Sequence, residues 1–137
     1  KSSRNSMRAS QQEKRDSNSA EAAALPAFSR LAEGAYHHRL AVSSGITVVL
    51  FSAPHCSACR VWKQRLPQAL ASIAGAFYEV DVSEATGVAR EFGIFHLPTI
   101  YLYRDGRFHA ELQCEARSES IRFTALRLLD APAQEEP

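Results

Sequence analysis

Two cysteines separated by two residues are the part of this chain whose residue types and spacing indicate chemistry. Cys56 and Cys59 follow an apolar, β-branched run at 46–51 and stand where a segment with helical spacing begins, at Ser57. The unpaired N–H groups and partial positive charge of a first helical turn favour a thiolate, and a cysteine there has a pKa of about 3.5 to 7.5 instead of about 8.5. A second cysteine one turn further along can attack a mixed disulfide formed on the first. The pair therefore predicts thiol chemistry.

Metal binding is the competing chemistry for two close cysteines. A structural zinc site of the ribbon type needs a second close pair of Cys or His, and none follows Cys59. His37 and His38 are neighbours on a predicted helix and point about a third of a turn apart, which favours solvated surface side chains. The chain has three cysteines, and Cys114 has no obvious partner. We therefore predict no metal site.

Length and composition predict one domain with a polar extension. The 137 residues are 45% hydrophobic and have a formal net charge of +1, so they supply a core but no charge excess for nucleic acid. The longest apolar runs are strand-length, far short of the roughly 20 residues that cross a bilayer, so we expect no membrane span. The chain begins at Lys1 instead of Met, which favours a mature or trimmed form and slightly favours a periplasmic or organellar compartment over the cytoplasm.

The elements that position the cysteines follow from hydrophobic spacing, glycines and prolines. They are a helix at 26–42, a strand at 46–52, a helix from 57 to 73, a strand at 76–82, a short helix from 83 to 92, a strand within 94–103 opened by Pro98, a strand at 108–113 and a helix from Ser118 to 129. Strands separated by helices imply parallel pairing, and the Asp105-Gly106 turn implies an antiparallel hairpin. The result is a mixed central sheet with helices on both faces.

Polar composition sets the domain boundaries. Residues 1–24 are rich in Ser, Arg, Gln and Asn and cannot bury enough apolar surface to offset the entropy of ordering. We predict a flexible polar tail or linker at 1–24, one domain at 25–131 and a disordered tail at 132–137. A partner that binds the N-terminal tail would order it, so assembly into a larger complex through this tail stays open.

Taken together, these features resemble the thioredoxin family over roughly residues 26–130. The shared motifs are the strand end Ser52-Ala53-Pro54-His55, the Cys56-Ser57-Ala58-Cys59 pair, the proline at 67, the Val80-Asp81-Val82 strand, the run from Phe92-Gly93-Ile94 to Leu97-Pro98-Thr99, and the Asp105-Gly106 hairpin. A lone C-x-x-C is weak evidence, but this combination is specific. The resemblance implies the thioredoxin fold, an α/β/α arrangement of three layers with a mixed sheet of about four strands and a C-terminal hairpin plus helix. It also implies a cis bond between Leu97 and Pro98 beside the disulfide, and a Leu97 backbone free to pair with an extended substrate.

Four positions depart from the family pattern. His55 precedes the first cysteine where the family usually has Trp, and it either stabilises the thiolate when protonated or faces solvent at the rim. Leu50 stands where the family has a buried acid, generally assigned to proton transfer at the second cysteine. Glu79, where the family has a lysine on the next strand, can supply that carboxylate instead. Cys114 stands where the family usually has glycine, as either a buried or half-buried free thiol or a third redox thiol.

The predicted function is thiol–disulfide exchange with a protein partner that carries a disulfide or dithiol. Cys56 is the nucleophile and Cys59 the resolving cysteine, so that a Cys56–Cys59 disulfide forms without any further cofactor. Leu97, Pro98 and His55 are expected to contact the substrate, with Glu79 and Cys114 as auxiliary residues. An upstream reductase or a membrane electron donor would supply electrons.

A different class of function is the alternative. The missing acid at Leu50, the unusual His55 and the polar tail also fit a thioredoxin-fold accessory or interaction subunit of a larger complex, with little or no redox turnover. A redox titration separates the two predictions.

Overall fold

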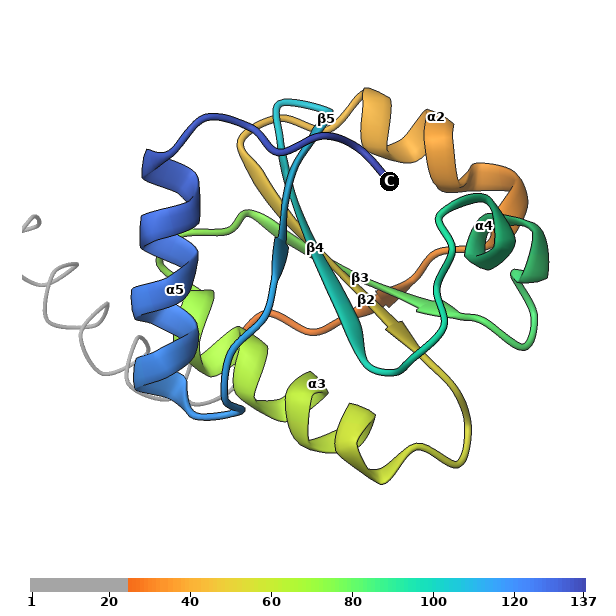
Figure 1. The fold of residues 1–137 in the computed structure, drawn as a ribbon, viewed down its shortest axis with the longest axis horizontal. Coiled ribbons are helices and arrows are strands. Elements are labelled where there is room, and N and C mark those ends of the chain that lie inside the picture. The colour runs from red at the N-terminus through yellow and green to blue at the C-terminus, as the bar shows by residue number, and fades with distance from the viewer. Residues whose placement is uncertain (1–24) are drawn as a thin grey trace, which may run out of the picture.

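The computed structural model describes residues 25–137, in which helices and strands alternate up to a final hairpin and helix (Figure 1). The elements are β1 (Ser29–Arg30), the 3-10 helix η1 (Glu33–Ala35), α2 (Tyr36–Ala41), β2 (Ile46–Ser52), α3 (Ser57–Leu70), β3 (Ala76–Asp81), α4 (Thr86–Glu91), β4 (Thr99–Arg104), β5 (Arg107–Leu112) and α5 (Ser118–Asp130). The strands form one mixed sheet in the order β1-β3-β2-β4-β5, parallel from β1 to β2 and antiparallel from β2 to β5. This is the predicted fold class, with a fifth, two-residue strand added.

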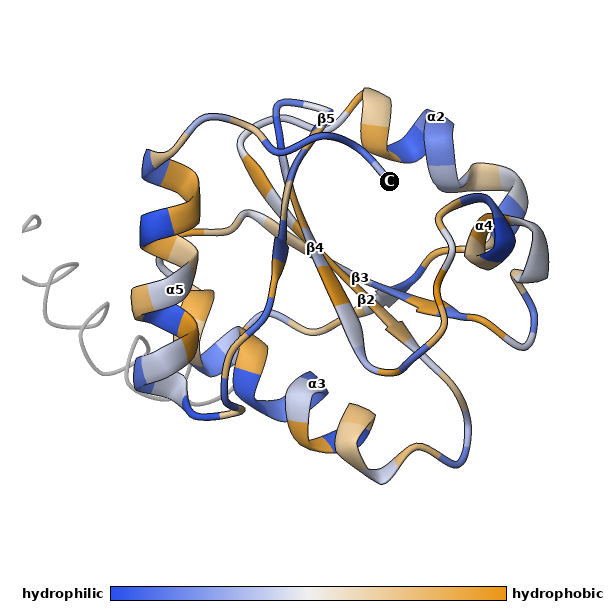
Figure 2. Cartoon of the chain, in the orientation of Figure 1, coloured by the Kyte–Doolittle hydropathy of each residue, from blue (hydrophilic) through white to orange (hydrophobic). Residues whose placement is uncertain are grey.

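Strand β2 lies at the centre of the sheet because it is apolar on both faces. Val48 and Leu50 point to one face, where α3 and α5 cover them, while Val49 and Phe51 point to the other, under α2 and α4 (Figure 1). All four side chains are fully buried. Figure 2 shows hydrophobic residues along β2 and β4, with hydrophilic ones on the outer surfaces of the helices. Two separate cores, one on each side of the sheet, therefore hold the strand that leads to the cysteines.

The first predicted helix, at 26–42, is wrong in its first half. Residues Ser29 and Arg30 instead pair in parallel with Tyr78 and Glu79 of β3 as the short strand β1. Phe28 packs against the core under α3 and α5, whereas Leu31 is buried in the core on the opposite face. Residues three apart share a face in a helix but lie on opposite faces in a strand. Apolar residues three apart are therefore compatible both with one buried face of a helix and with a strand that is buried on both faces. The helical part is confined to η1 and α2.

Two further boundaries differ from the predicted ones. Helix α3 runs through Pro67 but ends at Leu70, not 73, because the N–H groups of Ile73 and Ala74 both turn back to the Leu70 carbonyl. Helix α5 begins at Ser118 as predicted, with Arg117 as an N-cap residue that makes no side-chain cap, but it ends at Asp130, one residue later than predicted. Both differences are within a few residues and leave the packing of the helices unchanged.

The hairpin between β4 and β5 is the tight turn that Asp-Gly predicted. Asp105 and Gly106 both have positive φ angles, 51° and 84°, as a type I′ turn requires. The turn is tied to the loop before β2, because the Gly45 N–H donates to Asp105 Oδ1 at 2.7 Å and the Asp105 N–H donates to the Gly45 carbonyl at 2.8 Å. A Cβ on Gly106 would lie 2.6 Å from the carbonyl oxygen of Ala41, so the turn also packs closely against the end of α2.

The segment after α5 lies along the outer edge of β5. The Gln134 N–H donates to the His109 carbonyl at 2.7 Å, and the Glu111 N–H donates to Gln134 Oε1 at 3.0 Å. His109 Nε2 lies 2.8 Å from the Leu128 carbonyl and 3.0 Å from that of Ala131, so it donates to the end of α5. The tail predicted at 132–137 thus has hydrogen bonds to the sheet, while the tail predicted at 1–24 lies outside the described residues. The domain boundaries stay a prediction.

No helix between residues 25 and 137 is both long enough and apolar enough to cross a membrane.

Candidate active site

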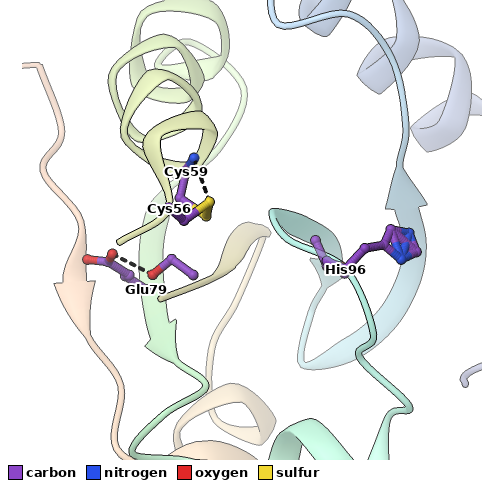
Figure 3. Close-up of a disulfide and its surroundings, with 6 residues drawn as sticks. Cys56, Cys59, Glu79 and His96 are labelled. Carbon is purple, nitrogen blue, oxygen red and sulfur yellow. Dashed lines mark hydrogen bonds between the residues drawn. A yellow bond between two sulfur atoms is a disulfide. The ribbon is translucent and has the colours of Figure 1, made fainter. Parts of the chain in front are cut away.

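Cys56 and Cys59 form a disulfide at the N-terminus of α3, just after the loop that follows β2. Their Cα atoms are 5.2 Å apart, within the usual range for a disulfide. Cys56 is the N-cap residue of α3, with extended backbone angles, and its Sγ accepts a hydrogen bond from the Cys59 N–H at 3.0 Å (Figure 3). The sulfur of Cys56 therefore occupies the place of an N-cap oxygen and accepts from an N–H of the first turn that has no partner within the helix. The same geometry stabilises a thiolate on Cys56 once the disulfide is reduced.

The two sulfurs differ in access. Cys56 is half-buried, whereas Cys59 is only 3% exposed and belongs to the buried residues of the protein. A bulky partner disulfide can therefore approach Cys56 but not Cys59. This asymmetry supports the predicted roles of attacking and resolving cysteine, which stay predictions for each residue.

A polar cluster, in which Ser52 is buried, Glu79 half-buried and Lys63 exposed, lines the same cavity as the disulfide. Glu79 leaves β3 toward α3, where Lys63 Nζ lies 2.9 Å from its Oε1. The Ser52 hydroxyl donates to Glu79 Oε2 at 2.7 Å, which is the hydrogen bond drawn at Glu79 in Figure 3. Burial opposes ionisation of Glu79, but the hydrogen bonds from Lys63 and Ser52 outweigh burial and hold the pKa of the carboxyl below its ordinary value. Glu79 is therefore a carboxylate at neutral pH.

This cluster and the disulfide line one cavity of about 180 Å³. Its walls include Cys56, Cys59, Ser52, Lys63, Glu79, Asp81 and Arg30. Asp81 is held by Arg30 at 3.2 Å and by hydrogen bonds from the hydroxyl and N–H of Ser83, and the Ser83 hydroxyl is the main reason why the pKa of Asp81 lies below its ordinary value. The cavity gives the buried Cys59 a polar, charged environment.

The sequence pattern indicated Glu79 as an auxiliary residue but gave Lys63 and Ser52 no role at the site. Lys63 follows Cys59 by four residues, so the two share a face of α3, and this spacing is a usable signal. Ser52 is the polar residue that ends an otherwise apolar strand, on the same face as Leu50. The contact of Ser52 with Glu79 depends on the pairing of β2 with β3, and that of Lys63 depends on how α3 packs on the sheet. Sequence alone fixes neither.

The residues expected to contact substrate lie around the loop before β4. The Leu97–Pro98 peptide bond is cis. Among residues 25–137, no hydrogen bond engages the backbone N–H or carbonyl of Leu97. His96 points away from the disulfide (Figure 3). His55 is exposed beside Cys56, and its side chain makes no hydrogen bond or ion pair within the described part of the chain.

Cys114 lies apart from the cavity that contains the two other cysteines. It is a half-buried free thiol on a second cavity of about 290 Å³, whose walls include Trp62, His96, Pro98 and Glu111. Burial raises the pKa of the Cys114 thiol and Glu115 adds to this effect, while a hydrogen bond with Thr124 partly opposes it. Cys114 is thus beside Pro98 and in its protonated form at neutral pH. Its redox role stays a prediction.

No group of three or more His, Cys, Asp or Glu side chains within residues 25–137 is arranged to hold a metal ion.

Known proteins share both the sequence pattern and the fold. The family model named Thioredoxin matches residues 27–126. Thioredoxin Asp f 29 from Aspergillus fumigatus is 32% identical over 75 residues, which are 53% of this chain and 68% of that protein. Thioredoxin Asp f 28 from the same fungus is 34% identical over 71 residues, 51% of this chain and 66% of that protein. The structure is also similar to that of the oxidised mitochondrial thioredoxin 3 from Saccharomyces cerevisiae, with a TM-score of 0.58 and 21% identity over 76% of this chain and 95% of that one.

Proposed function

The chain belongs to the thioredoxin family and is a thiol–disulfide oxidoreductase, and from this premise we propose that it exchanges disulfides with a protein partner through Cys56 and Cys59. One observation carries the proposal. The sulfur of Cys56 is accessible and accepts a hydrogen bond at the N-terminus of α3, while its disulfide partner Cys59 is buried directly behind it. An accessible, stabilised thiolate backed by a second thiol is what the two steps of exchange require.

In the reducing direction, the Cys56 thiolate attacks one sulfur of the partner's disulfide. The partner's S–S bond breaks, a mixed disulfide forms on Cys56, and the other partner sulfur leaves as a thiolate. Cys59 loses its proton and attacks the Cys56 sulfur, which releases the second partner sulfur as a thiolate and closes the Cys56–Cys59 bond. Two electrons pass from this chain to the partner, and the oxidising direction is the reverse of these steps.

Glu79 is the proposed acceptor of the Cys59 proton. Its carboxylate and the Cys59 sulfur line the same cavity, which opens a path from the buried thiol toward solvent. The ion pair with Lys63 keeps Glu79 ionised, so an acceptor is present throughout the neutral range. Lys63 also offsets the carboxylate charge, which would otherwise disfavour the Cys59 thiolate.

The proposed substrate site is the exposed backbone of Leu97 next to Pro98, with His55 on the other side of Cys56. A backbone N–H and carbonyl without a hydrogen-bond partner among residues 25–137 can pair with an extended segment of the partner, as in strand addition. The redox chemistry needs no cofactor beyond the disulfide. Electrons would come from a dithiol, on either an upstream reductase or a membrane electron donor.

The test compares two single substitutions in an insulin-reduction assay. Cys56→Ser should abolish reduction, whereas Cys59→Ser should accumulate mixed disulfides with the partner, visible by non-reducing electrophoresis and mass spectrometry. Unchanged activity in both variants would refute the proposal. A redox titration adds a second readout. A reversible two-electron couple between about −120 and −300 mV supports exchange, and inert or permanently reduced thiols would instead support the accessory-subunit alternative.

A further inference from the structure

Phe95 is exposed to an extent that nothing in the fold explains. Its side chain is 92% exposed, the highest value among the large hydrophobic residues between 25 and 137. Phe123, the next most exposed aromatic at 64%, has the Arg127 guanidinium over its ring. No aromatic pair or cation–π contact among the described residues includes Phe95. Since burial of a phenylalanine ring would be favourable, an unpartnered ring at this place suggests contact with another molecule.

The ring lines a cavity next to the loop that carries the proposed substrate site. This cavity, of about 330 Å³, lies between α4 and the loop before β4, and its walls include Val82, Ala89, Ile94 and Phe95. The Phe95 ring lies against Gly93, 3.7 Å from where a Cβ on that residue would be. Phe95 precedes Leu97 by two residues, so the Cα atoms of the two residues lie at most about 7 Å apart. A partner segment that pairs with Leu97 is therefore within reach of the ring.

The charge next to this surface is positive. Arg90, on the wall of the same cavity, is exposed and takes part in no ion pair within residues 25–137. Of the acids near α4, Glu84 lies 3.6 Å from Arg30, Glu91 lies 3.0 Å from His37, and the Glu33 carboxylate lies against Gly87 without an ion pair to Arg90. A carboxylate on the partner would find in Arg90 a cation that no carboxylate between residues 25 and 137 pairs with.

We propose that Phe95 and Arg90 determine substrate specificity, by selecting an extended partner segment that has an apolar side chain and an acidic residue near its disulfide. The apolar side chain enters the cavity between Val82, Ala89 and Ile94 and packs against the Phe95 ring, while the acidic residue pairs with Arg90. This inference rests on the proposed exchange activity. It assigns no redox role to either residue, since both act by binding.

The test uses two synthetic peptide disulfides that differ at two positions near the cysteine, with Phe and Asp in one and Ser and Asn in the other. The readout is the ratio of kcat/KM for the two peptides with the full chain. Wild type should prefer the Phe/Asp peptide, and Phe95→Ser should lower the ratio about tenfold, a typical effect of losing one aromatic anchor. A mixed Phe/Asn peptide isolates the charge, and Arg90→Gln should remove the preference for Asp over Asn.

Phe123→Ser is the matched control, because it also removes an exposed ring but on α5, and it should leave the ratio unchanged. An unchanged ratio in Phe95→Ser, or an equal fall in Phe123→Ser, would overturn the inference. Exchange of the wild type with dithiothreitol, followed in parallel, tests the proposed function separately. If dithiothreitol exchange occurs and wild type treats both peptides alike, only the specificity inference fails. If dithiothreitol exchange is absent, the proposed function fails first.

Discussion

Leu50 and Glu79 are register partners on β2 and β3, so both side chains leave the sheet on the face covered by α3. The apolar Leu50 fills the core, and the carboxylate stands one strand further out, where Lys63 from the helix and Ser52 from β2 can reach it. The acidic group near the cysteines, Glu79, is one member of an ion pair. Lys63 Nζ, at 2.9 Å, keeps the Glu79 carboxylate ionised.

The ion pair of Glu79 predicts a pH-dependent contribution to stability. Because the pKa of Glu79 is lowered in the folded protein, this contribution is present above the ordinary pKa of a glutamate and is lost as the pH falls through the lower, folded pKa. Glu79→Gln should therefore be less stable than wild type at about pH 6, by about 1–2 kcal/mol, and the difference should narrow toward about pH 3. Denaturant unfolding of the oxidised proteins measures this difference in the free energy of unfolding. Glu135→Gln, at an exposed position, is the control. A difference between wild type and Glu79→Gln that became larger on acidification would contradict the ion pair.

The environments of the cysteines predict their order of alkylation in the reduced protein. The pKa of Cys114 is raised by burial, whereas Cys56 would have its thiolate stabilised at the start of α3. Near neutral pH, iodoacetamide should modify Cys56 first, and Cys114 should become reactive only as the pH rises above the ordinary thiol range. Peptide mapping by mass spectrometry over time gives the order. Modification of Cys114 before Cys56 would be inconsistent with these surroundings, and a Cys56–Cys114 disulfide under mild oxidant would establish the third redox thiol.

At the scale of elements, the sequence predicts the strands and turns that are determined by their own residues. It does not predict those that form only against a neighbouring strand. Strand β2 was predicted with its actual bounds because six consecutive apolar or β-branched residues have no other local solution, and the hairpin followed from Asp105-Gly106. Strand β1 was missed because two residues become a strand only where β3 offers an edge. The cysteines and Pro98 were predicted from a motif, but the meeting of Lys63, Ser52 and Glu79 depends on register and helix packing.

The hairpin predicts a large difference between two glycines. Gly106 has a positive φ of 84°, and a Cβ there would lie 2.6 Å from a backbone oxygen of α2, whereas a Cβ on Gly34 would meet nothing within 4 Å. Gly106→Ala should lower the free energy of unfolding by about 1–3 kcal/mol, because both the backbone angle and the contact are unfavourable. Gly34→Ala, its control, should change it by less than about 0.5 kcal/mol. Equal effects in urea unfolding would show that the turn tolerates a side chain.

On the scale of the whole molecule, the site forms at the end of the sheet where two strands finish and a third begins. Strands β2 and β3 end there at Ser52 and Asp81, and the antiparallel β4 begins there at Thr99. The disulfide follows β2, Glu79 lies near the end of β3, and the loop with Pro98 precedes β4. Because cores on both faces hold the sheet, these groups are fixed relative to one another by the most buried part of the protein.

The predicted domain boundary can be tested by removing residues 1–24. If residues 25–137 contain the whole folded unit, the shortened chain should unfold in a single transition with the same denaturant dependence as the full chain and a free energy within about 1 kcal/mol of it. Its disulfide exchange with dithiothreitol should also match. A marked loss of stability or a broadened transition would place part of the folded unit before residue 25.

The hydrogen bonds of Gln134 have a consequence for how copies of the protein behave in concentrated solution. At one side the sheet ends in a strand of two residues, and at the other in β5, whose outward-facing His109 carbonyl and Glu111 N–H are both taken up by Gln134. An open strand edge is a template for pairing with another chain, and proteins commonly cover such edges. The C-terminal segment covers the edge of β5, so it opposes aggregation by pairing between the edge strands of two copies.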